Sequence, residues 1–516
     1  MKFYSRAHAR RSLFHTAIFR TLSQLASVAS YVVLVRGMTE QTFGILNILY
    51  AVIPVISTAA SLGIEQTLRR YQPEYLQAGQ AQAAAWLVRA AASARFATNV
   101  ALLGIIILLW QWIAPFFQLQ PYRAEFLLFS LLVLLHFQAS ILQISLSSHM
   151  LQGYSVGMTV VLSVAKLLAY LVLIRFDSLT LTNAILADTV GYGLMYAGLR
   201  VAHARHCRPP LIDRGFTLEG TERRRLLRYS FFNNFNDAGT MLLTSRTDNF
   251  FLAALMNPLA VGAYAFYVRL NQMTAHLLPT RQFSNVIQPL FFAIPPHEAA
   301  RRIPRYFTLL TNLTGTMQMP IFAYALAYHA ELVSVFFGGK FLESSWLLPV
   351  IVGFATINRV EVSVTMVAQY QEKASILLLS KIFGIYNAIM LLVLIPVAGI
   401  YGAAIATGSA QLLKNFYVWW HVRDTARWTN LRAVIAMTAV IWVPCVTVCF
   451  ALKELLALPP AMHLVFGTVL CGLGTILYVR SPALSPSDRE ILASVFHGRE
   501  ARVLTWLGII RTANAK

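Results

Sequence analysis

The sequence predicts an all-α, multi-pass membrane protein with about 14 transmembrane helices, because stretches of about 20 apolar residues, the length that spans a hydrocarbon core, follow one another along it. The composition agrees: of 516 residues, 57% are apolar and 12% are charged, and the mean hydropathy is +0.60. No water-soluble domain of this length exposes so apolar a surface without aggregating. The connections are short, which leaves no room for a sizeable soluble domain.

The predicted spans are helices and not the strands of a membrane barrel. Barrel strands alternate apolar and polar residues over about ten positions, whereas residues 100–109 and 389–395 are apolar on every face. Each span runs between breaks in the hydropathy pattern. In order, the spans lie near residues 13–35, 44–67, 96–115, 125–149, 156–174, 182–200, 230–254, 261–291, 306–329, 344–369, 375–395, 400–421, 432–452 and 461–479.

The distribution of lysine and arginine predicts that both termini lie in the cytoplasm. The formal net charge is +21, but the basic residues are spread along the chain and do not form the single patch of a nucleic-acid-binding domain. With the N-terminus inside, roughly 29 basic residues fall in inner segments and about five in outer loops. The outer residues are Arg36, Arg123, Arg175, Lys340 and Lys453.

An internal repeat predicts two lobes of six helices each. Residues 38–44 match 256–262 at an offset of 218, and Phe116-Phe117 match Phe336-Phe337 at an offset of 220. A nearly constant offset across several helices indicates a duplicated unit. An even number of helices per copy gives both copies the same orientation in the membrane. The predicted organisation is an N-terminal lobe (1–205), a basic cytoplasmic linker (206–229), a C-terminal lobe (230–425), helices 13 and 14 (426–480) and a cytoplasmic tail (481–516) on the inner membrane face.

Polar residues follow a helical period in the first helices of each lobe. In the first helix, Arg20, Ser23 and Ser30 share one face, and we expect this face to point into a wet cavity. Ionisable residues within spans cost about 2.5 to 3.5 kcal/mol each on insertion scales, so they face a cavity or a partner and not lipid. The basic residues within spans are Arg20, Lys166, Arg246, Arg269, Arg281, Arg359, Lys381 and Lys414, and the acidic ones are Glu65, Asp188, Asp237, Asp248 and Glu361.

The surplus of basic residues predicts a cavity that binds an anion. Arginine suits phosphate, because its planar fork donates two parallel hydrogen bonds and stays charged when desolvated. The candidate substrate-binding residues are Arg20, Arg246, Arg269, Arg281, Arg359, Lys381 and Lys166, and the candidates for coupling to an ion are Asp237, Asp248, Glu65, Asp188 and Glu361.

Structural roles compete with this interpretation. Arg246 with Asp248, and Arg359 with Glu361, are alternative structural pairs, whereas Lys414, Arg281 and Glu65 are alternative interfacial groups that reach the headgroups. Of the four cysteines, Cys445 and Cys449 lie one helical turn apart and are interpreted as small packing residues. No disulfide framework, metal site or catalytic motif is predicted, and no cofactor is expected beyond a coupling proton or sodium ion.

Several stretches resemble Wzx-type polysaccharide and O-antigen flippases of the multidrug/oligosaccharidyl-lipid/polysaccharide exporter superfamily. The N-terminal matches are Arg36 to Gly44, Ser61 to Glu65 and Arg69-Arg70-Tyr71. The later matches are Pro258 to Tyr264, Glu331 to Gly338, Ile395-Pro396 and Gly399 to Ala404. The resemblance extends to about residue 425 and consists of loose motifs, so it identifies a superfamily better than a member.

The resemblance implies a V-shaped pair of six-helix bundles with a central cationic cavity. It implies movement of an undecaprenyl pyrophosphate-linked oligosaccharide from the cytoplasmic to the outer leaflet of a bacterial inner membrane, for O-antigen, capsule or exopolysaccharide synthesis. Arg20 and Arg269 lie in helices where related lipid II flippases carry essential arginines. The second helix lacks a mid-span arginine, which argues against lipid II itself as substrate.

The expected partners are the lipid-linked substrate, the bilayer and other polysaccharide assembly proteins, with no nucleic acid. Two alternatives remain: an ion-coupled multidrug antiporter on the same fold, and a membrane glycosyltransferase or polymerase. An antiporter is expected to concentrate acidic residues in its cavity. A glycosyltransferase is expected to carry a sizeable external loop.

Overall fold

The computed structural model describes residues 6–207, 218–241, 243, 245–275, 291, 294–495 and 505. Within these ranges every regular element is a helix. Nine helices of the described part are long and apolar enough to cross a membrane, and the predicted all-α membrane fold is confirmed. The number of fourteen spans stays a prediction. Two compact units divide the chain, Met1–Gly262 and Ala263–Lys516, while the predicted lobe, linker and tail boundaries stay predictions.

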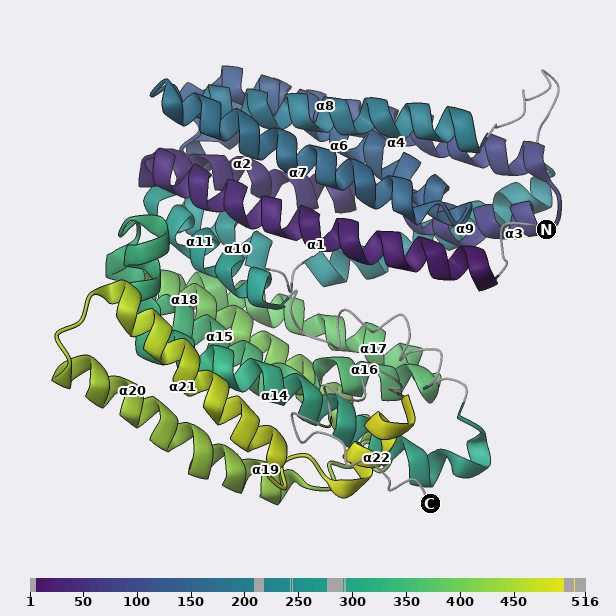
Figure 1. Cartoon of the computed structure of the whole chain (residues 1–516). Helices are drawn as coiled ribbons and strands as arrows, with labels where there is room; N and C mark the ends of the chain where they lie inside the picture. Colours follow the sequence, from purple (N-terminus) through teal and green to yellow (C-terminus); the bar gives the residue numbers. More distant parts are fainter. Residues whose placement is uncertain are drawn as a thin grey trace. The chain divides into compact units, whose positions relative to one another are not determined.

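The first unit is a bundle whose longest helices lie side by side (Figure 1). The helix α1 packs along α7, and α6 packs against α8. A core cluster that includes Ala139, Leu146 and Leu199 holds α6 and α8 together. The elements are α1 (Arg6–Gly37), α2 (Glu40–Ala59), α3 (Ile64–Gln77), α4 (Ala81–Leu108), α5 (Trp110–Ile113), η2 (Ala114–Phe117), η3 (Gln120–Tyr122), α6 (Arg123–Ser148), α7 (Gln152–Arg175), α8 (Leu181–His206), α9 (Gly220–Met241), α10 (Ser245–Leu255) and α11 (Pro258–Ala275), which crosses the unit boundary.

Part of the polar face predicted on the first helix lies in a helix interface. Ser23 and Ser30 of α1 are buried. The Ser23 hydroxyl lies 3.1 Å from that of Ser163 on α7, and the Ser30 hydroxyl donates to the Ser163 carbonyl at 3.2 Å. Small hydroxyl residues let two helices approach closely and hydrogen-bond to each other inside a membrane. These two serines therefore join helices, and the expectation that they face a wet cavity is wrong.

The second predicted span ends early. Residues 44–67 were expected to form one helix, but α2 ends at Ala59 and α3 begins at Ile64. Leu62 and Gly63 between them have φ values of 47° and 69°. A side chain at Gly63 would place its Cβ 1.9 Å from the Ser230 carbonyl oxygen, so only glycine fits the turn. Glu65 consequently lies in the first turn of α3.

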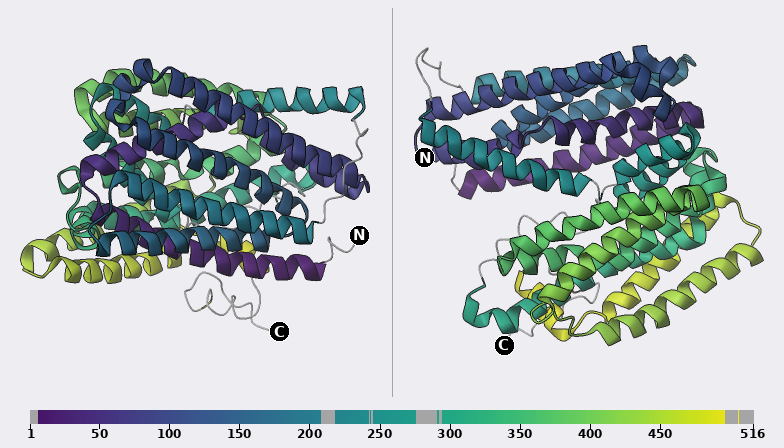
Figure 2. Two further views of the ribbon diagram at one scale, coloured as in Figure 1. Left: turned by 90° about the horizontal axis from the view of Figure 1, so that it is seen from above. Right: turned by 180° about the vertical axis from the view of Figure 1, so that it is seen from behind.

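The second unit consists of long helices interrupted by short 3-10 or π segments (Figure 2). A core cluster that includes Ile303, Phe307, Val364 and Val367 joins α14 to α16. The helix α14 also packs along α21. Beyond α11, the elements are α14 (Pro296–Phe337), η4 (Leu342–Ser344), α15 (Leu347–Ile357), η5 (Asn358–Val360), α16 (Glu361–Tyr370), α17 (Ala374–Leu379), η6 (Ser380–Ile382), α18 (Phe383–Val422), α19 (Leu431–Met437), the π-helical η7 (Thr438–Trp442), α20 (Val443–Leu455), α21 (Pro460–Arg480) and α22 (Pro486–Val495).

The 40-residue element α18 is a hairpin of two helices. Gly399 interrupts it with a φ of 56° and a ψ of −133°. The Thr407 hydroxyl donates to the Asn387 side chain at 3.2 Å across 20 residues. In a straight helix those residues would lie about 30 Å apart, so the two arms must fold back on each other. The arms correspond to the separate spans predicted at 375–395 and 400–421.

The tail helix α22 docks on the second unit, and the expected position of the tail on the inner membrane face stays a prediction. Leu492 packs against Leu309 of α14. The buried Asp488 carboxylate accepts a hydrogen bond from the Asn312 amide at 3.0 Å and from the Ser485 backbone N–H at 2.9 Å. The Asp488 N–H donates to the Ser485 hydroxyl at 3.1 Å. This reciprocal capping box starts the helix and also fixes it to α14.

Replacing Asp488 should release α22. Asp488→Ala removes one of the two acceptors of the Asn312 amide, the other being Asn430, and we expect it to destabilise docking by about 1–3 kcal/mol. Burial raises the pKa of the Asp488 carboxyl above its ordinary value. Docking should therefore be strongest below the ordinary pKa, and it should weaken as the pH rises from there through the raised pKa. Asp488→Asn should keep the hydrogen bonds and lose this pH dependence. Hydrogen exchange of residues 486–495 measures both effects, with Glu490→Gln as the control; unchanged exchange in Asp488→Ala would contradict the docking role.

Candidate functional site

A buried carboxylate in the first unit collects three donors. Asp188 of α8 is 1% exposed. Its Oδ1 lies 2.9 Å from the Lys166 ammonium of α7, and the hydroxyls of Tyr50 and Tyr170 donate to its two oxygens. The Lys166 nitrogen also lies 5.9 Å from the ring centre of each tyrosine. This Asp188 cluster joins α2, α7 and α8.

Charge compensation explains the composition of the Asp188 cluster. An isolated carboxylate in an apolar interior is strongly disfavoured, so it needs an opposite charge and hydrogen-bond donors. Lys166 provides the charge, and the two phenols fill the remaining acceptor positions of Asp188. Of the predicted residues, the structure therefore brings together Lys166 and Asp188, one assigned to substrate binding and one to ion coupling. Chemically, the cluster can hold a pair of opposite charges away from water.

A second buried group in the first unit surrounds Arg95 of α4. Arg95 is fully buried, and its guanidinium lies 4.1 Å from the ring centre of Phe137. Its Nη2 lies 3.8 Å from Glu65 Oε1 and donates to the Ser57 carbonyl at 3.3 Å. The Nε and Nη1 of Arg95 and both amide atoms of the buried Asn99 have no hydrogen-bond partner within the described residues. Glu65 thus lies near Arg95, and its alternative role as an interfacial group stays a prediction.

Sequence reasoning missed Arg95, because it placed this residue in a cytoplasmic loop. The predicted third span begins at 96, whereas α4 begins at Ala81 and carries the helix across residue 95. Residues 81–92 contain seven alanines among few charges, and this strong helix-forming composition was the available indication.

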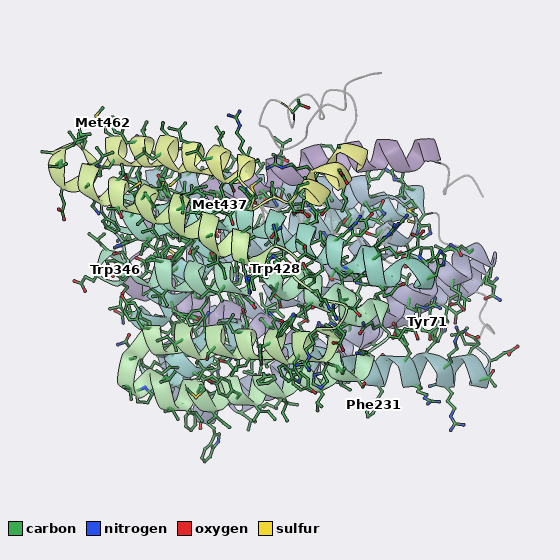
Figure 3. The ribbon with its side chains drawn as sticks, turned by 90° about the horizontal axis from the view of Figure 1, so that it is seen from below. Tyr71, Phe231, Trp346, Trp428, Met437 and Met462 are labelled. Carbon is green, nitrogen blue, oxygen red and sulfur yellow. The ribbon has the colours of Figure 1, made fainter. Side chains whose placement is uncertain are left out.

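In the second unit, Arg359 and Glu361 do not form the pair considered from the sequence. The Arg359 guanidinium lies 4.9 Å from the ring centre of Trp428, which is labelled in Figure 3. A Cβ at Gly315 of α14 would lie 2.5 Å from Arg359 Nη1, so the arginine packs directly on this helix. Glu361 instead accepts from Lys414 at 2.6 Å. The two residues separate because η5 turns the backbone between α15 and α16.

The remaining predicted residues lie apart from these groups. Arg20 of α1 is exposed and Arg269 of α11 is partly buried, and neither forms an ion pair within the described part of the chain. Asp248 of α10 is fully buried, and Lys381 lies in η6. The side chains of Arg246 and Asp237, and the whole of Arg281, lie outside the described residues.

A cavity of about 520 Å³ lies within the first unit, between α3, α4, α6 and α8. Most of its wall is apolar, and four basic side chains line it: Arg89, His149, Arg200 and His203. The Gln72 side chain, 1% exposed, also lines the cavity; its amide donates to Ser145 at 2.8 Å, while its Oε1 has no partner within the described residues. The cavity also reaches Cys207, and burial raises the pKa of this thiol to about 12.

The composition of this cavity suits an amphiphile with an anionic head. Arg89 and Arg200 are exposed residues at its wall, and guanidinium groups bind phosphate oxygens in pairs. Residues such as Val88, Ile141 and Leu142 provide apolar contact. None of the twelve residues predicted from the sequence lines this cavity. In the sequence, the basic residues of the cavity appeared only as part of the Lys/Arg bias. The cavity itself was not predictable, because its apolar wall comes from four separate helices.

The Asp188 cluster generates a prediction about stability. Asp188→Asn or Lys166→Met alone leaves a buried charge without its partner, and we expect each to lower the free energy of unfolding by about 3–5 kcal/mol. The double substitution should cost less than the two single changes together. Unfolding of the purified protein in detergent measures this cycle, with Arg70→Met of the exposed Arg70–Glu74 pair as the control. Additive single effects would show that the pair does not couple.

Comparison with known proteins places the chain in a family. A family model described as "Polysaccharide biosynthesis protein" matches residues 33–346. Comparison with curated protein sequences finds no match. Among solved structures, the lipid II flippase MurJ in an inward closed conformation is 11% identical, with 90% of this chain and 98% of that chain covered and a TM-score of 0.59.

A multidrug resistance MATE family transporter of the MOP superfamily, in an inward-facing conformation, is equally similar in fold. It is 11% identical, with 80% of this chain and 98% of that chain covered and a TM-score of 0.59. Identities this low indicate a shared fold and no more, and together with the family model they confirm the predicted superfamily. The chain therefore belongs to the polysaccharide biosynthesis protein family, with the fold shared by MurJ and MATE transporters.

Proposed function

We propose that the protein is a flippase that moves an undecaprenyl pyrophosphate-linked oligosaccharide across the bacterial cytoplasmic membrane by alternating access. The product would serve the assembly of O-antigen, capsule or exopolysaccharide. The observation that carries this proposal is the polysaccharide biosynthesis family match over residues 33–346 in a chain with MurJ-like topology. Both termini are proposed to lie in the cytoplasm, and other polysaccharide assembly proteins are proposed partners.

Ion pairing separates the predicted basic residues into two groups. Lys166 and Lys414 are compensated by Asp188 and Glu361, so they add little net charge to their surroundings. Arg20, Arg269 and Arg359 form no ion pair with a carboxylate in the part of the chain that the structure describes. The surplus positive charge therefore belongs to arginines, the side chain best suited to a pyrophosphate. We assign substrate binding to these arginines and structural charge compensation to the lysines.

Ion coupling is proposed at Asp188. Protonation of this carboxylate would leave the Lys166 ammonium as a buried positive charge without its partner. The packing of α2, α7 and α8 would then be less stable than in the unprotonated state. The other acidic candidates, Asp237, Asp248, Glu65 and Glu361, stay proposals for ion coupling as well; Glu65 and Glu361 each face one basic residue, as Asp188 does.

The cavity between α3, α4, α6 and α8 is proposed as a docking place for the phosphate end of the lipid. Its basic residues come from α4, α6 and α8, near the ends of these helices that the charge distribution places in the cytoplasm. A substrate that is assembled on the cytoplasmic side must be captured at that end. An apolar wall beside guanidinium groups would accommodate both the pyrophosphate and the first part of its lipid.

The first test is complementation by an arginine variant. In a host that lacks the gene, the wild-type chain should restore surface polysaccharide, and Arg269→Ala should fail to do so while the completed lipid-linked unit accumulates. We expect a loss of at least about tenfold, because one charge-assisted hydrogen bond to phosphate contributes roughly 1.5–3 kcal/mol. Arg123→Ala, an exposed arginine at the start of α6, is the matched control. Full rescue by Arg269→Ala would remove this residue from the substrate site.

A second test addresses the cavity. Arg89→Gln together with Arg200→Gln should raise the substrate concentration needed for half-maximal flipping in proteoliposomes, with little change in the maximal rate, because capture and not the later movement is weakened. Arg69→Gln with Arg70→Gln, a pair on α3 that does not line the cavity, is the control. Equal effects in both double variants would indicate a general charge effect and contradict a docking site.

The MATE-like fold supports a second candidate, an ion-coupled multidrug antiporter. A host without the gene that makes normal polysaccharide but becomes sensitive to cationic drugs would establish this alternative and end the flippase proposal. Turnover of a sugar donor by the purified protein would instead support the membrane glycosyltransferase or polymerase that the sequence left open.

A further inference from the structure

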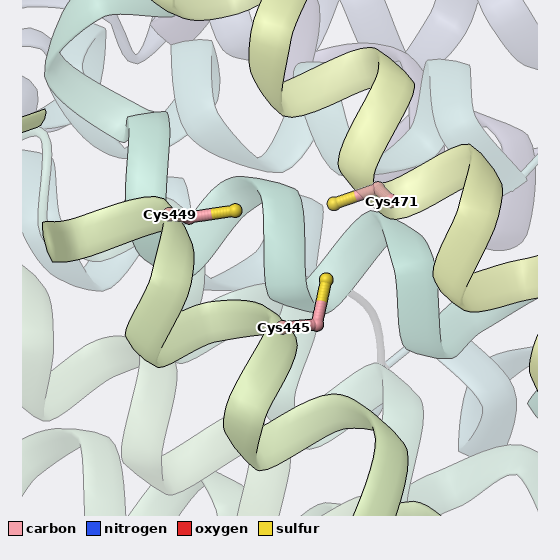
Figure 4. Close-up of side chains that lie close together, drawn as sticks. All are labelled: Cys445, Cys449 and Cys471. Atoms are coloured by element: carbon pink, nitrogen blue, oxygen red, sulfur yellow. The ribbon is translucent and has the colours of Figure 1, made fainter. Parts of the chain in front are cut away.

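Three of the four cysteines meet between the last two long helices. Cys445 and Cys449 lie on α20, and Cys471 lies on α21. Their sulfur atoms all lie within 4.8 Å of one another, and in Figure 4 the three side chains point toward a common centre. From the sequence, Cys445 and Cys449 alone were interpreted as packing residues, because the approach of Cys471 depends on the pairing of the two helices.

The surroundings of these thiols are soft and apolar. Cys449 is packed with Tyr328 and Leu464. Cys471 belongs to a cluster with Trp442, and two thioethers, Met319 and Met437, pack against the same cluster. Thiolate and thioether sulfurs select soft metal ions, Cu(I) above all among the common ones. A π-helical turn, Thr438–Trp442, directly precedes α20, and such turns are frequent at functional sites.

We propose that Cys445, Cys449 and Cys471 form a binding site for one Cu(I) ion that joins α20 to α21. A metal–sulfur bond of about 2.3 Å places the three sulfurs of a trigonal site about 4 Å apart. The observed separations need to shrink by less than about 1 Å, which small side-chain rotations provide. Trigonal coordination uses all three donors.

The number of donors favours Cu(I) over Zn²⁺. A structural zinc site needs four ligands in tetrahedral arrangement, whereas the group of His, Cys, Asp and Glu donors within the described residues has three members here.

The proton balance makes the proposal testable by pH. Cysteine binds a metal ion as the thiolate, so each coordinating thiol releases one H⁺, and below the thiol pKa the affinity should fall about tenfold per coordinating thiolate for each unit of decrease in pH. Three thiolates on the ion would give a steeper dependence and a complex of charge −2. The pH slope thus reports the number of thiolates directly.

The fourth cysteine allows a matched control. Cys207 directly follows α8 in the first unit, whereas the three clustered cysteines belong to the second unit. The full-length Cys207→Ser protein, purified in detergent without oxygen, is titrated with Cu(I) against a chromogenic Cu(I) chelator. We expect one Cu(I) per chain and a raised Tm. Adding Cys471→Ser should weaken binding by at least about 100-fold and abolish the shift in Tm.

The outcomes decide the proposal in either direction. The proposal is overturned if the Cys207→Ser protein binds no Cu(I). It is also overturned if Cu(I) binding stays unchanged after the further substitutions Cys471→Ser, Cys449→Ser and Cys445→Ser. If a serine variant fails to fold, the corresponding Cys→Ala variant, which adds no polar atom to the apolar interior, replaces it. The titration of Cys207→Ser alone already refutes the proposal if no Cu(I) is bound, so misfolding of a variant does not protect it.

Discussion

The cost of placing a charge in an apolar interior governs the arrangement of this protein. A helix that crosses a bilayer satisfies its own backbone, but an ionisable side chain on it needs a partner from another helix. Asp188 has Lys166 and two tyrosines, Glu361 has Lys414, and Glu331 has Lys453 at 2.6 Å. Each pair joins helices that are separate in the chain. The pairs therefore act as specific contacts in a core that otherwise consists of interchangeable apolar side chains.

The same constraint distinguishes candidate binding groups from structural ones. A basic residue with a carboxylate partner is already compensated and gains little from an anionic substrate. Two arginines are less fully compensated than these paired residues. Arg269 has no carboxylate partner among the described residues. The guanidinium of Arg95 keeps two nitrogen atoms that have no hydrogen-bond partner there. Arg95 also lies at 3.8 Å from Glu65, a long distance for an ion pair. Compensation is thus a more useful criterion than the presence of a charge within a span.

In this interpretation, function depends on a rigid framework of helices that carries a few basic side chains without an acidic partner. The family match places the chain among polysaccharide biosynthesis proteins, and its fold is shared with MurJ. Paired charges, serine contacts between α1 and α7, and the Gly399 hairpin give the frame its geometry. Arginines without carboxylate partners and the cavity of the first unit are the proposed binding groups for a phosphate. The three cysteines stand outside this scheme and add a separate contact between α20 and α21.

The sequence by itself determined the membrane location and the helical class, since hydrophobicity and helical period are local properties of consecutive residues. Its motifs, by resemblance, also indicated the superfamily. It also predicted that charges such as Lys166 and Asp188 face a cavity or a partner and not lipid. It did not determine which charges meet, because contacts between helices depend on packing: Glu361 pairs with Lys414 and not with Arg359. The fully buried state of Arg95, the cavity at Gln72 and the meeting of Cys471 with Cys445 and Cys449 likewise arise only when helices that are distant in the chain lie side by side.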